Sequence, residues 1–270
     1  MFLFVVSLRK NNTMKKKEKK KAVKKIELQD KSSDIHSFDK PSLTVDCVVF
    51  GYDLKALKVL LVNRKDAPFK NHWALPGGFL KTQTETFEDT ATRVLATKTG
   101  LTNLYMEQLY TYGAVERDER GRVVSVVYFA LVNPHNYQIT NGLMNNETQW
   151  FAFDELPNLA FDHSKIVAMA QKRLQNKVRY QPIGFDLLDK EFTISELQRL
   201  YETIVGFAID RRNFRKKMLA LEIIQPTGEK RAIGGHRSPD VYVFNKEKYD
   251  ELMEKGFEGS ILSLSRRGVE

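Results

Sequence analysis

The sequence is nearly free of cysteine, with Cys47 alone among 270 residues. A lone cysteine excludes an intramolecular disulfide and a zinc site built from cysteines, so the sequence favours a reducing compartment, the cytoplasm. The chain also lacks any run of about 18 apolar residues, so no segment is predicted to span or bind a membrane. Because Cys47 stands in the apolar run LTVDCVVFGY, we expect it to pack in a core rather than to react.

Positive charge is concentrated at the start of the chain. The formal net charge is +9, and residues 1–29 hold ten Lys and Arg against two Glu, a balance of +8. A segment such as MKKKEKKKAVKK cannot bury enough apolar surface to fold, so we predict a disordered basic arm over residues 1–41. A solvated tail and a nonspecific contact with phosphates both remain open for this arm.

Residues 42–178 have the pattern of one domain with a mixed sheet and few helices. Helices are predicted over residues 86–99, ended by Gly100, and from near Asp162 to residue 178. Polar turns are expected at RDERGR and NGLMNNE. Strands are predicted at LTVDCVVFGY and ALKVLLVNRK and within residues 103–117, 121–132 and 148–153.

The first of these helices carries part of a known motif. Residues 77–101, GGFLKTQTETFEDTATRVLATKTGL, resemble the Nudix box, and WALPGG precedes them as it usually does in that family. The spacing from Gly78 to Glu85 is one residue longer than the pattern. The matching positions are Glu85, Arg93, Leu95, Gly100 and Leu101. The three helix glutamates of the box are replaced by Val94, Thr97 and Lys98.

These replacements remove the groups that would hold a metal. Positions i, i+3 and i+4 share one helix face, so the glutamates of the family converge there on Mg²⁺. Valine cannot ligate, Thr97 offers a neutral hydroxyl, and Lys98 places a cation where it would repel a metal by roughly a few kcal/mol. Glu88 and Asp89 cannot replace these glutamates, because around the helix axis they point roughly 120° or more away from the direction of Val94. We predict no metal site, no catalytic residues and no enzymatic activity. The helix then either only packs or lines a pocket that binds without turnover.

Residues 179–258 are predicted to form a winged helix-turn-helix, followed by a tail at 259–270. Thr193 and Glu196 form a capping-box pattern before a helix over residues 193–206. A basic helix over 211–224 and two strands within 225–244 should follow. DNA contacts are predicted from Arg211, Arg212, Asn213, Arg215, Lys216 and Lys217 on this helix, and from Lys230, Arg231 and Arg237 at the wing. A solvated helix end is the alternative.

Four further stretches strengthen the likeness to a family. With the altered box, LAFDH at 159–163, IGFDLL at 183–188, FTISELQRLYE at 192–202 and NFRKKM at 213–218 resemble the Nudix-related transcriptional regulators. This resemblance covers residues 42 to about 250. It implies an α+β fold: a Nudix-like α/β/α sandwich with a mixed sheet, followed by a small winged helix-turn-helix domain. It also implies a repressor, or sometimes an activator, whose homodimer releases double-stranded operator DNA when a metabolite binds.

The resemblance leaves two effectors open. One branch is similar to regulators of NAD biosynthesis that sense ADP-ribose, and another to a regulator of arabinose use. We prefer ADP-ribose over a pentose because Arg64, Lys98 and Arg117 offer cations for a diphosphate. The predicted pocket further includes Trp73, Arg93 and Phe161. No cofactor is expected. The alternatives are a Mg²⁺-dependent Nudix hydrolase of nucleoside diphosphate derivatives such as ADP-ribose, and an interaction protein that does not bind DNA.

Overall fold

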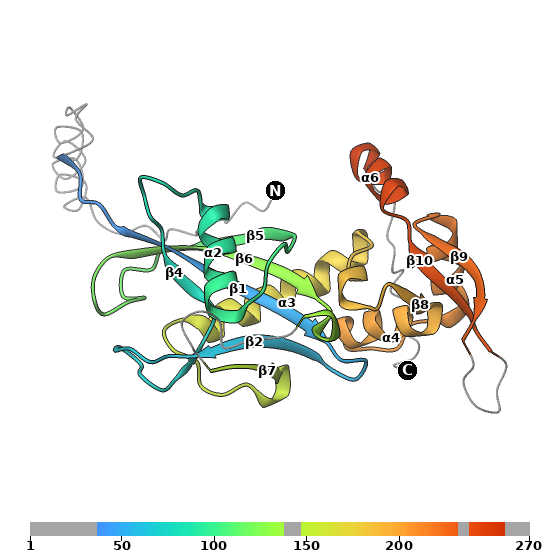
Figure 1. Ribbon diagram of the computed structural model, residues 1–270, viewed down its shortest axis with the longest axis horizontal. Helices are drawn as coiled ribbons and strands as arrows, with labels where there is room; N and C mark the ends of the chain where they lie inside the picture. The colour runs from blue at the N-terminus through green and yellow to red at the C-terminus, as the bar shows by residue number, and fades with distance from the viewer. Residues whose placement is uncertain (1–36, 138–146, 232–237, 257–270) are drawn as a thin grey trace, which may run out of the picture. The chain divides into compact units, whose positions relative to one another are not determined.

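The computed structural model describes residues 37–137, 147–231 and 238–256 (Figure 1). The chain divides into two units, Met1–Pro41 and Ser42–Glu270. All the elements labelled in Figure 1 belong to the second unit. Four predictions lie wholly or mostly outside the described residues: the basic arm, the turn NGLMNNE, Arg237 and the tail at 259–270. Within the described ranges, no helix is long and apolar enough to cross a membrane.

A seven-stranded mixed sheet forms the first part of this unit. Its strands are β1 (Ser42–Tyr52), β2 (Leu57–Asn63), β3 (Trp73–Ala74), β4 (Gly77–Phe79), β5 (Met106–Tyr112), β6 (Val123–Val132) and β7 (Thr148–Ala152). They lie in the order β3-β2-β1-β6-β5, with β4 paired to β1 and β7 paired to β2. β1 runs parallel to β6, and the remaining pairs are antiparallel. This mixture confirms the predicted sheet type.

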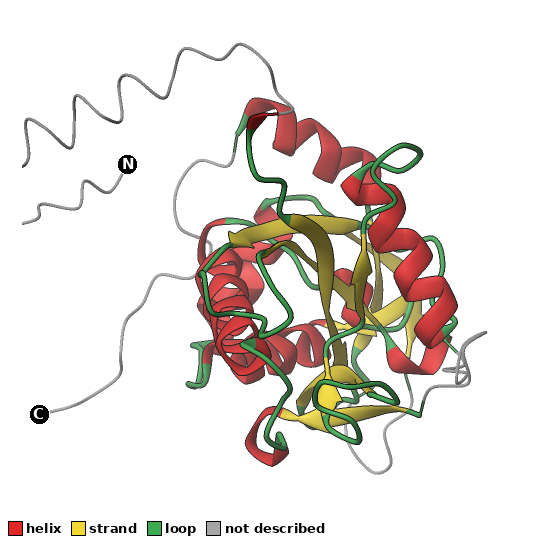
Figure 2. Ribbon diagram, turned by 90° about the vertical axis from the view of Figure 1, so that its left-hand side faces the viewer, coloured by secondary structure: helices red, strands yellow, loops and turns green. Residues whose placement is uncertain are grey.

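Helices cover both faces of the sheet (Figures 1 and 2). Successive side chains of a strand point to opposite faces, so β1 contributes to two cores. Val45 and Cys47 pack in the cluster that contains Leu95 of α2 (Phe87–Thr99). Val48 packs in the cluster that contains Ile166 of α3 (His163–Tyr180). The α/β/α sandwich is therefore confirmed, and so is the core position of Cys47.

Local hydrogen bonds fix the ends of α2 where they were predicted. The backbone N–H of Asp89 donates to Thr86 Oγ1 at 3.1 Å, and the N–H of Thr86 donates to the Asp89 carboxylate at 3.0 Å. Gly100 ends the helix with φ of 77°, a conformation that costs glycine little. These caps fix both ends of the helical part of the altered Nudix box.

A winged helix follows α3 and confirms the second predicted domain type. Its elements are β8 (Glu191–Thr193), α4 (Ile194–Val205), α5 (Arg211–Ala220), β9 (Ile224–Lys230), β10 (Asp240–Phe244) and α6 (Lys246–Lys255). The strands form an antiparallel sheet in the order β8-β10-β9. The capping box of Thr193 and Glu196 begins α4 as predicted.

The structure differs from the prediction for this domain in two ways: one helix is shorter than predicted, and one helix was not predicted. The helix expected over residues 211–224 ends at Ala220, because Glu222 adopts φ of 56° and turns the chain. Ile223 and Ile224 belong instead to the buried core beside β10. The helix α6 was missed, because its apolar stripe is short: Tyr249 and Leu252 pack partly buried against the core, and no residue of the helix is fully buried.

Candidate functional site

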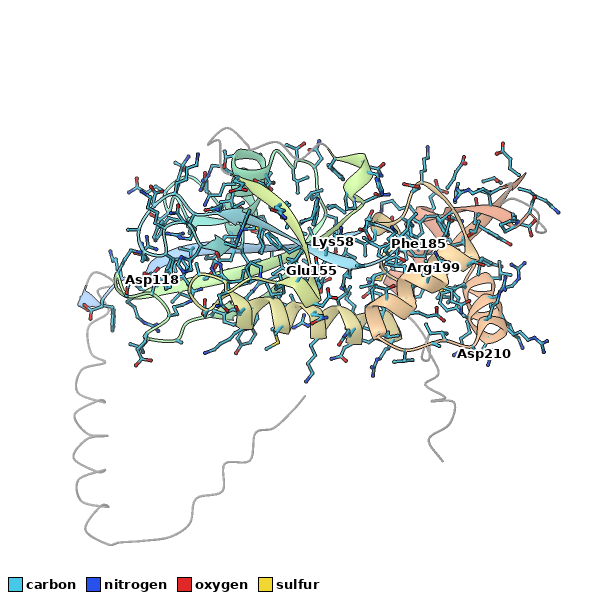
Figure 3. The ribbon with its side chains drawn as sticks, turned by 90° about the horizontal axis from the view of Figure 1, so that it is seen from below. Lys58, Asp118, Glu155, Phe185, Arg199 and Asp210 are labelled. Carbon is cyan, nitrogen blue, oxygen red and sulfur yellow. The ribbon has the colours of Figure 1, made fainter. Side chains whose placement is uncertain are left out.

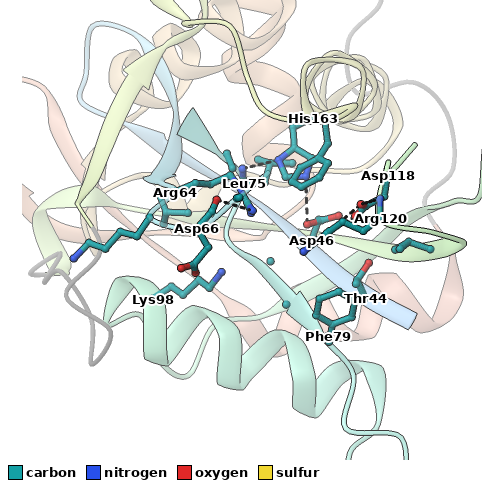
Figure 4. A pocket seen from close by; sticks show the side chains of 18 of the residues that line it. Thr44, Asp46, Arg64, Asp66, Leu75, Phe79, Lys98, Asp118, Arg120 and His163 are labelled. Carbon is teal, nitrogen blue, oxygen red and sulfur yellow. Dashed lines mark hydrogen bonds and ion pairs between the residues drawn. The ribbon is translucent and has the colours of Figure 1, made fainter. Parts of the chain in front are cut away.

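A polar cavity of about 260 Å³ lies among β1, β4, the loop after β2, α2 and the start of α3 (Figure 4). Four of the six predicted pocket residues line it, namely Arg64, Lys98, Arg117 and Phe161. Five basic side chains and three carboxylates contribute to the lining. They are Arg64, Lys65, Lys98, Arg117 and Arg120, and Asp46, Asp66 and Asp118. The cavity is therefore cationic in balance and suits an anionic ligand.

Asp46 is, with Asp118, one of the two buried acids that line this cavity. Ser125 Oγ donates to its carboxylate at 2.6 Å, and Arg117 and His163 each place a nitrogen 3.5 Å from it. Gly77 lies opposite Asp46 in the sheet, where a Cβ would come within 2.1 Å of Asp46 Oδ1. Sequence reasoning did not single out Asp46. The signal was present, because Asp46 is the one acid within the apolar run LTVDCVVF.

His163 has both ring nitrogens engaged. The N–H of Leu75 donates to Nδ1 at 2.9 Å, so the proton of the neutral ring is assigned to Nε2, which faces Asp46 Oδ1. Burial lowers the pKa of His163, and Asp46 opposes this shift. The ring is therefore a neutral link between β1 and the segment before β4.

Arg117 lines the cavity but is already paired. Its Nε and Nη2 donate to the two carboxylate oxygens of Asp162 at 3.1 and 2.8 Å, and Nη2 also reaches Asp46. The side chain is only 5% exposed. A guanidinium held by two acids has little positive charge left for a ligand, so its clearest role is to position Asp46 and the start of α3.

Phe161 lies against two guanidinium groups. The Cζ of Arg64 is 4.8 Å from the centre of its ring, and that of Arg120 is 5.6 Å away. Arg120 is paired with Asp118 at 2.7 Å and also faces the ring of Phe79 at 5.5 Å. Arg120 and Asp118 were missed, because nothing in RDERGR distinguishes a pocket residue from a turn residue.

The two other predicted pocket residues lie outside the cavity lining. The ring of Trp73 packs against that of Phe151, with centres 4.8 Å apart. Arg93 donates to Glu85 at 2.6 and 2.8 Å and to the carbonyl of Phe79 at 3.0 Å. This pairing lowers the pKa of Glu85 to about 2. Arg93 therefore ties the start of α2 to β4, and both residues contribute to packing around the cavity.

The helix α5 presents a basic face. Phe214 and Met218, one turn apart, are buried and hold the helix against the domain. Asp210, labelled in Figure 3, accepts from the N–H of Asn213 at 2.9 Å and caps the helix. Five of the six predicted residues of this helix are exposed, and Lys217 is half-buried. The exposed five are Arg211, Arg212, Asn213, Arg215 and Lys216.

The predicted wing residues differ in their surroundings. Lys230 has a side chain 57% exposed, and its amine lies 3.9 Å from Asp240. Arg231 donates to the carboxylate of Glu196 at 2.8 Å and to the carbonyl of Glu191 at 2.8 Å. Arg231 therefore joins the wing to the cap of α4, a structural task that the sequence did not indicate.

Comparison with known proteins matches both parts of the chain. The NUDIX domain model matches residues 40–170, and the NrtR DNA-binding winged helix domain matches residues 184–244. The chain is 36% identical to the ADPR responsive transcriptional repressor NtrR of Acinetobacter baylyi over 217 residues. These aligned residues make up 79% of this chain and 86% of that protein. The chain belongs to the NrtR family.

Two further relatives bear on this NrtR-family chain. The crystal structure of Shewanella oneidensis NrtR complexed with a 27mer DNA matches with a TM-score of 0.69 and 35% identity, over 77% of this chain and 95% of that one. The ADP-ribose pyrophosphatase of Methanocaldococcus jannaschii is 35% identical over 156 residues, which are 58% of this chain and 86% of that protein. A regulator and a hydrolase thus share the Nudix part.

The helix α2 of this NrtR-family chain does not fit a divalent metal. Val94 is buried, the Thr97 hydroxyl donates to the carbonyl of Arg93 at 2.7 Å, and Lys98 lines the cavity. The neighbouring acids are committed elsewhere: Glu85 pairs with Arg93, Glu88 accepts from the Tyr128 hydroxyl at 2.6 Å, and Asp89 caps the helix. In the part of the chain that the structure describes, no three His, Cys, Asp or Glu gather in a metal-binding arrangement.

Proposed function

We propose that this chain is a transcriptional repressor that binds operator DNA through α5 and releases it when ADP-ribose fills the Nudix cavity. In this proposal ADP-ribose is bound and not hydrolysed. The observation that carries the proposal is the position of Lys98, a lysine that lines the cavity where the Nudix box has a metal-binding glutamate. The name of the Acinetobacter relative, an ADPR responsive repressor, supports the same effector.

The lining favours ADP-ribose over a pentose. Arginine and lysine side chains pair with phosphate oxygens, whereas a neutral sugar such as arabinose has no charge to meet them. Phe79 lines the same cavity and is 49% exposed, and an exposed aromatic ring can stack on the flat face of a base. An ADP-ribose effector would place the chain in the control of NAD metabolism.

The charges of α5 favour a polyanionic partner. Arg211 and Arg212 begin the helix, where the helix dipole disfavours each cation by roughly 0.3–1 kcal/mol. Exposed cations that oppose the dipole are explained by phosphates outside the protein. We infer a homodimer whose two α5 helices enter successive major grooves of a near-palindromic operator. We also propose a cytoplasmic location, which the single cysteine predicts and which an operator DNA partner would require.

A second candidate function has one supporting observation. The Methanocaldococcus relative is an ADP-ribose pyrophosphatase and aligns with the Nudix part. A Mg²⁺-dependent hydrolase would require carboxylates to bind the metal and activate water, and Val94, Thr97 and Lys98 supply none. This difference is why we place regulation first and retain hydrolysis as the alternative.

A DNA-binding assay with the full chain tests the proposal. A fluorescent duplex from upstream of the gene should bind the wild type, and ADP-ribose should release it while arabinose does not. The double variant Arg212→Ala, Arg215→Ala should bind the duplex at least tenfold more weakly. Its affinity should also depend less steeply on salt concentration, by the amount that corresponds to the loss of roughly two phosphate contacts. Lys172→Ala, at an exposed lysine of α3, is the matched control. A duplex bound equally by all three proteins would reject α5 as the contact.

A further inference from the structure

Lys98 supplies one of the positive charges that line the cavity. It is on α2, one turn after Val94, and Figure 4 shows it rising from the helix toward Asp66. Val94 itself packs against β4, since a Cβ on Gly78 would come within 2.9 Å of Val94 Cγ2. The helix is therefore fixed to the sheet at Val94, and the next turn directs Lys98 into the cavity.

Two of the four other cations that line the cavity are paired with carboxylates. Arg117 is paired with Asp162 and Asp46, and Arg120 with Asp118. In contrast, neither Arg64 nor Lys98 has a carboxylate oxygen within 4.0 Å among the described residues. Arg64 instead donates to the carbonyls of Pro68 at 3.0 Å and Asp66 at 3.4 Å. Two positive charges therefore remain without a charged partner in one polar cavity.

We propose that the ammonium of Lys98, with the guanidinium of Arg64, binds the diphosphate directly and takes the place of the divalent cation. The effector is therefore bound without any metal, and Mg²⁺ does not strengthen binding. This inference rests on ADP-ribose as the effector and goes further, because it states which group of the protein neutralises the diphosphate. A lysine also cannot activate water as a metal does, so the same substitution accounts for binding without turnover.

The surroundings of Lys98 shift its pKa, so binding of an anion should change the protonation of its side chain. Burial lowers the pKa of Lys98, Arg64 lowers it further, and Asp46 and Asp66 oppose the shift. Cys47, the remaining titratable neighbour, is a neutral buried thiol whose pKa burial raises. A bound diphosphate stabilises the ammonium, so binding at alkaline pH takes up a proton. Affinity should therefore decrease with rising pH before the ordinary range of a lysine is reached.

Calorimetry of ADP-ribose binding to the full chain tests the inference. We expect equal affinity in chelator and in millimolar Mg²⁺. Lys98→Met should bind about tenfold or more weakly, and Lys98→Arg should restore most of the affinity by keeping the charge. Lys172→Met is the matched control and should bind as the wild type. A thermal melt of each variant shows that it is folded.

Each outcome has a distinct meaning. Equal affinity with and without Mg²⁺, together with loss in Lys98→Met and recovery in Lys98→Arg, supports the inference. Wild-type binding that requires Mg²⁺, or a folded Lys98→Met with unchanged affinity, overturns it while leaving ADP-ribose as effector. Absence of binding to the wild type in both buffers overturns the proposed effector and this inference with it.

Discussion

The N–H of Leu75 donates to Nδ1 of His163 at 2.9 Å, across 88 positions of sequence. This bond joins the segment before β4 to the first residue of α3. Replacing His163 by Leu would leave a buried N–H without an acceptor, at a cost of about 1–3 kcal/mol in the free energy of unfolding. His163→Asn should lose less, because Asn Oδ1 accepts from nearly the same place. Urea unfolding of both variants measures this, and equal losses would contradict the assigned bond.

The same histidine predicts how stability depends on pH. Its native pKa is lowered from 6.5, chiefly by burial, so below pH 6.5 the unfolded chain binds a proton more readily than the folded one. Its neutral form therefore contributes stability that is fully present above pH 6.5 and is lost as the pH falls toward the native pKa. Thermal melts between pH 5 and 8 should show a smaller acid loss in His163→Asn. Parallel curves would show that His163 does not titrate in this way.

Gly77 should be intolerant of a side chain. A Cβ there would meet Asp46 Oδ1 at 2.1 Å and the Val45 carbonyl at 3.0 Å. Gly77→Ala should therefore lower the free energy of unfolding by about 1–3 kcal/mol and weaken ADP-ribose binding by displacing Asp46. Gly113→Ala is the matched control, because its Cβ would meet nothing closer than 3.8 Å. Similar unfolding curves for the two variants would reject the close approach.

Lys230 and Arg231 are neighbours with different expected roles. Arg231→Ala removes the contacts to Glu196 and Glu191, so it should lower the free energy of unfolding by about 1 kcal/mol. Lys230→Ala should leave stability unchanged and weaken DNA binding. Paired melts and anisotropy titrations separate the two. If Arg231→Ala is as stable as the wild type and binds DNA more weakly, Arg231 contacts DNA, as the sequence predicted, and does not stabilise the domain.

The sequence predicted well what local interactions decide. Thr86 and Gly100 bound α2, and Thr193 begins α4, because capping involves residues only a few positions apart. The second helix was predicted too long because Ile223 and Ile224 continue an apolar pattern that also suits a strand core. Their choice between helix and sheet depends on β10, which the local sequence does not reveal.

The site was predictable only in part, because its residues meet through the fold. The cations Arg64 and Lys98 were found by their chemistry and by the altered box. Asp46 and Ser125 were not, since the Ser125 contact to Asp46 joins residues 79 positions apart. Trp73 and Arg93 were included for their motif positions, and the structure uses both in packing around the cavity.

One measurement tests sensing without turnover most directly. The full chain bound to its labelled upstream duplex is mixed with ADP-ribose and Mg²⁺, anisotropy follows the DNA, and chromatography of the same sample follows the nucleotide. We expect the DNA to be released and the ADP-ribose to be recovered intact. Conversion to AMP and ribose phosphate at enzyme-like rates, with the DNA still bound, would contradict this expectation.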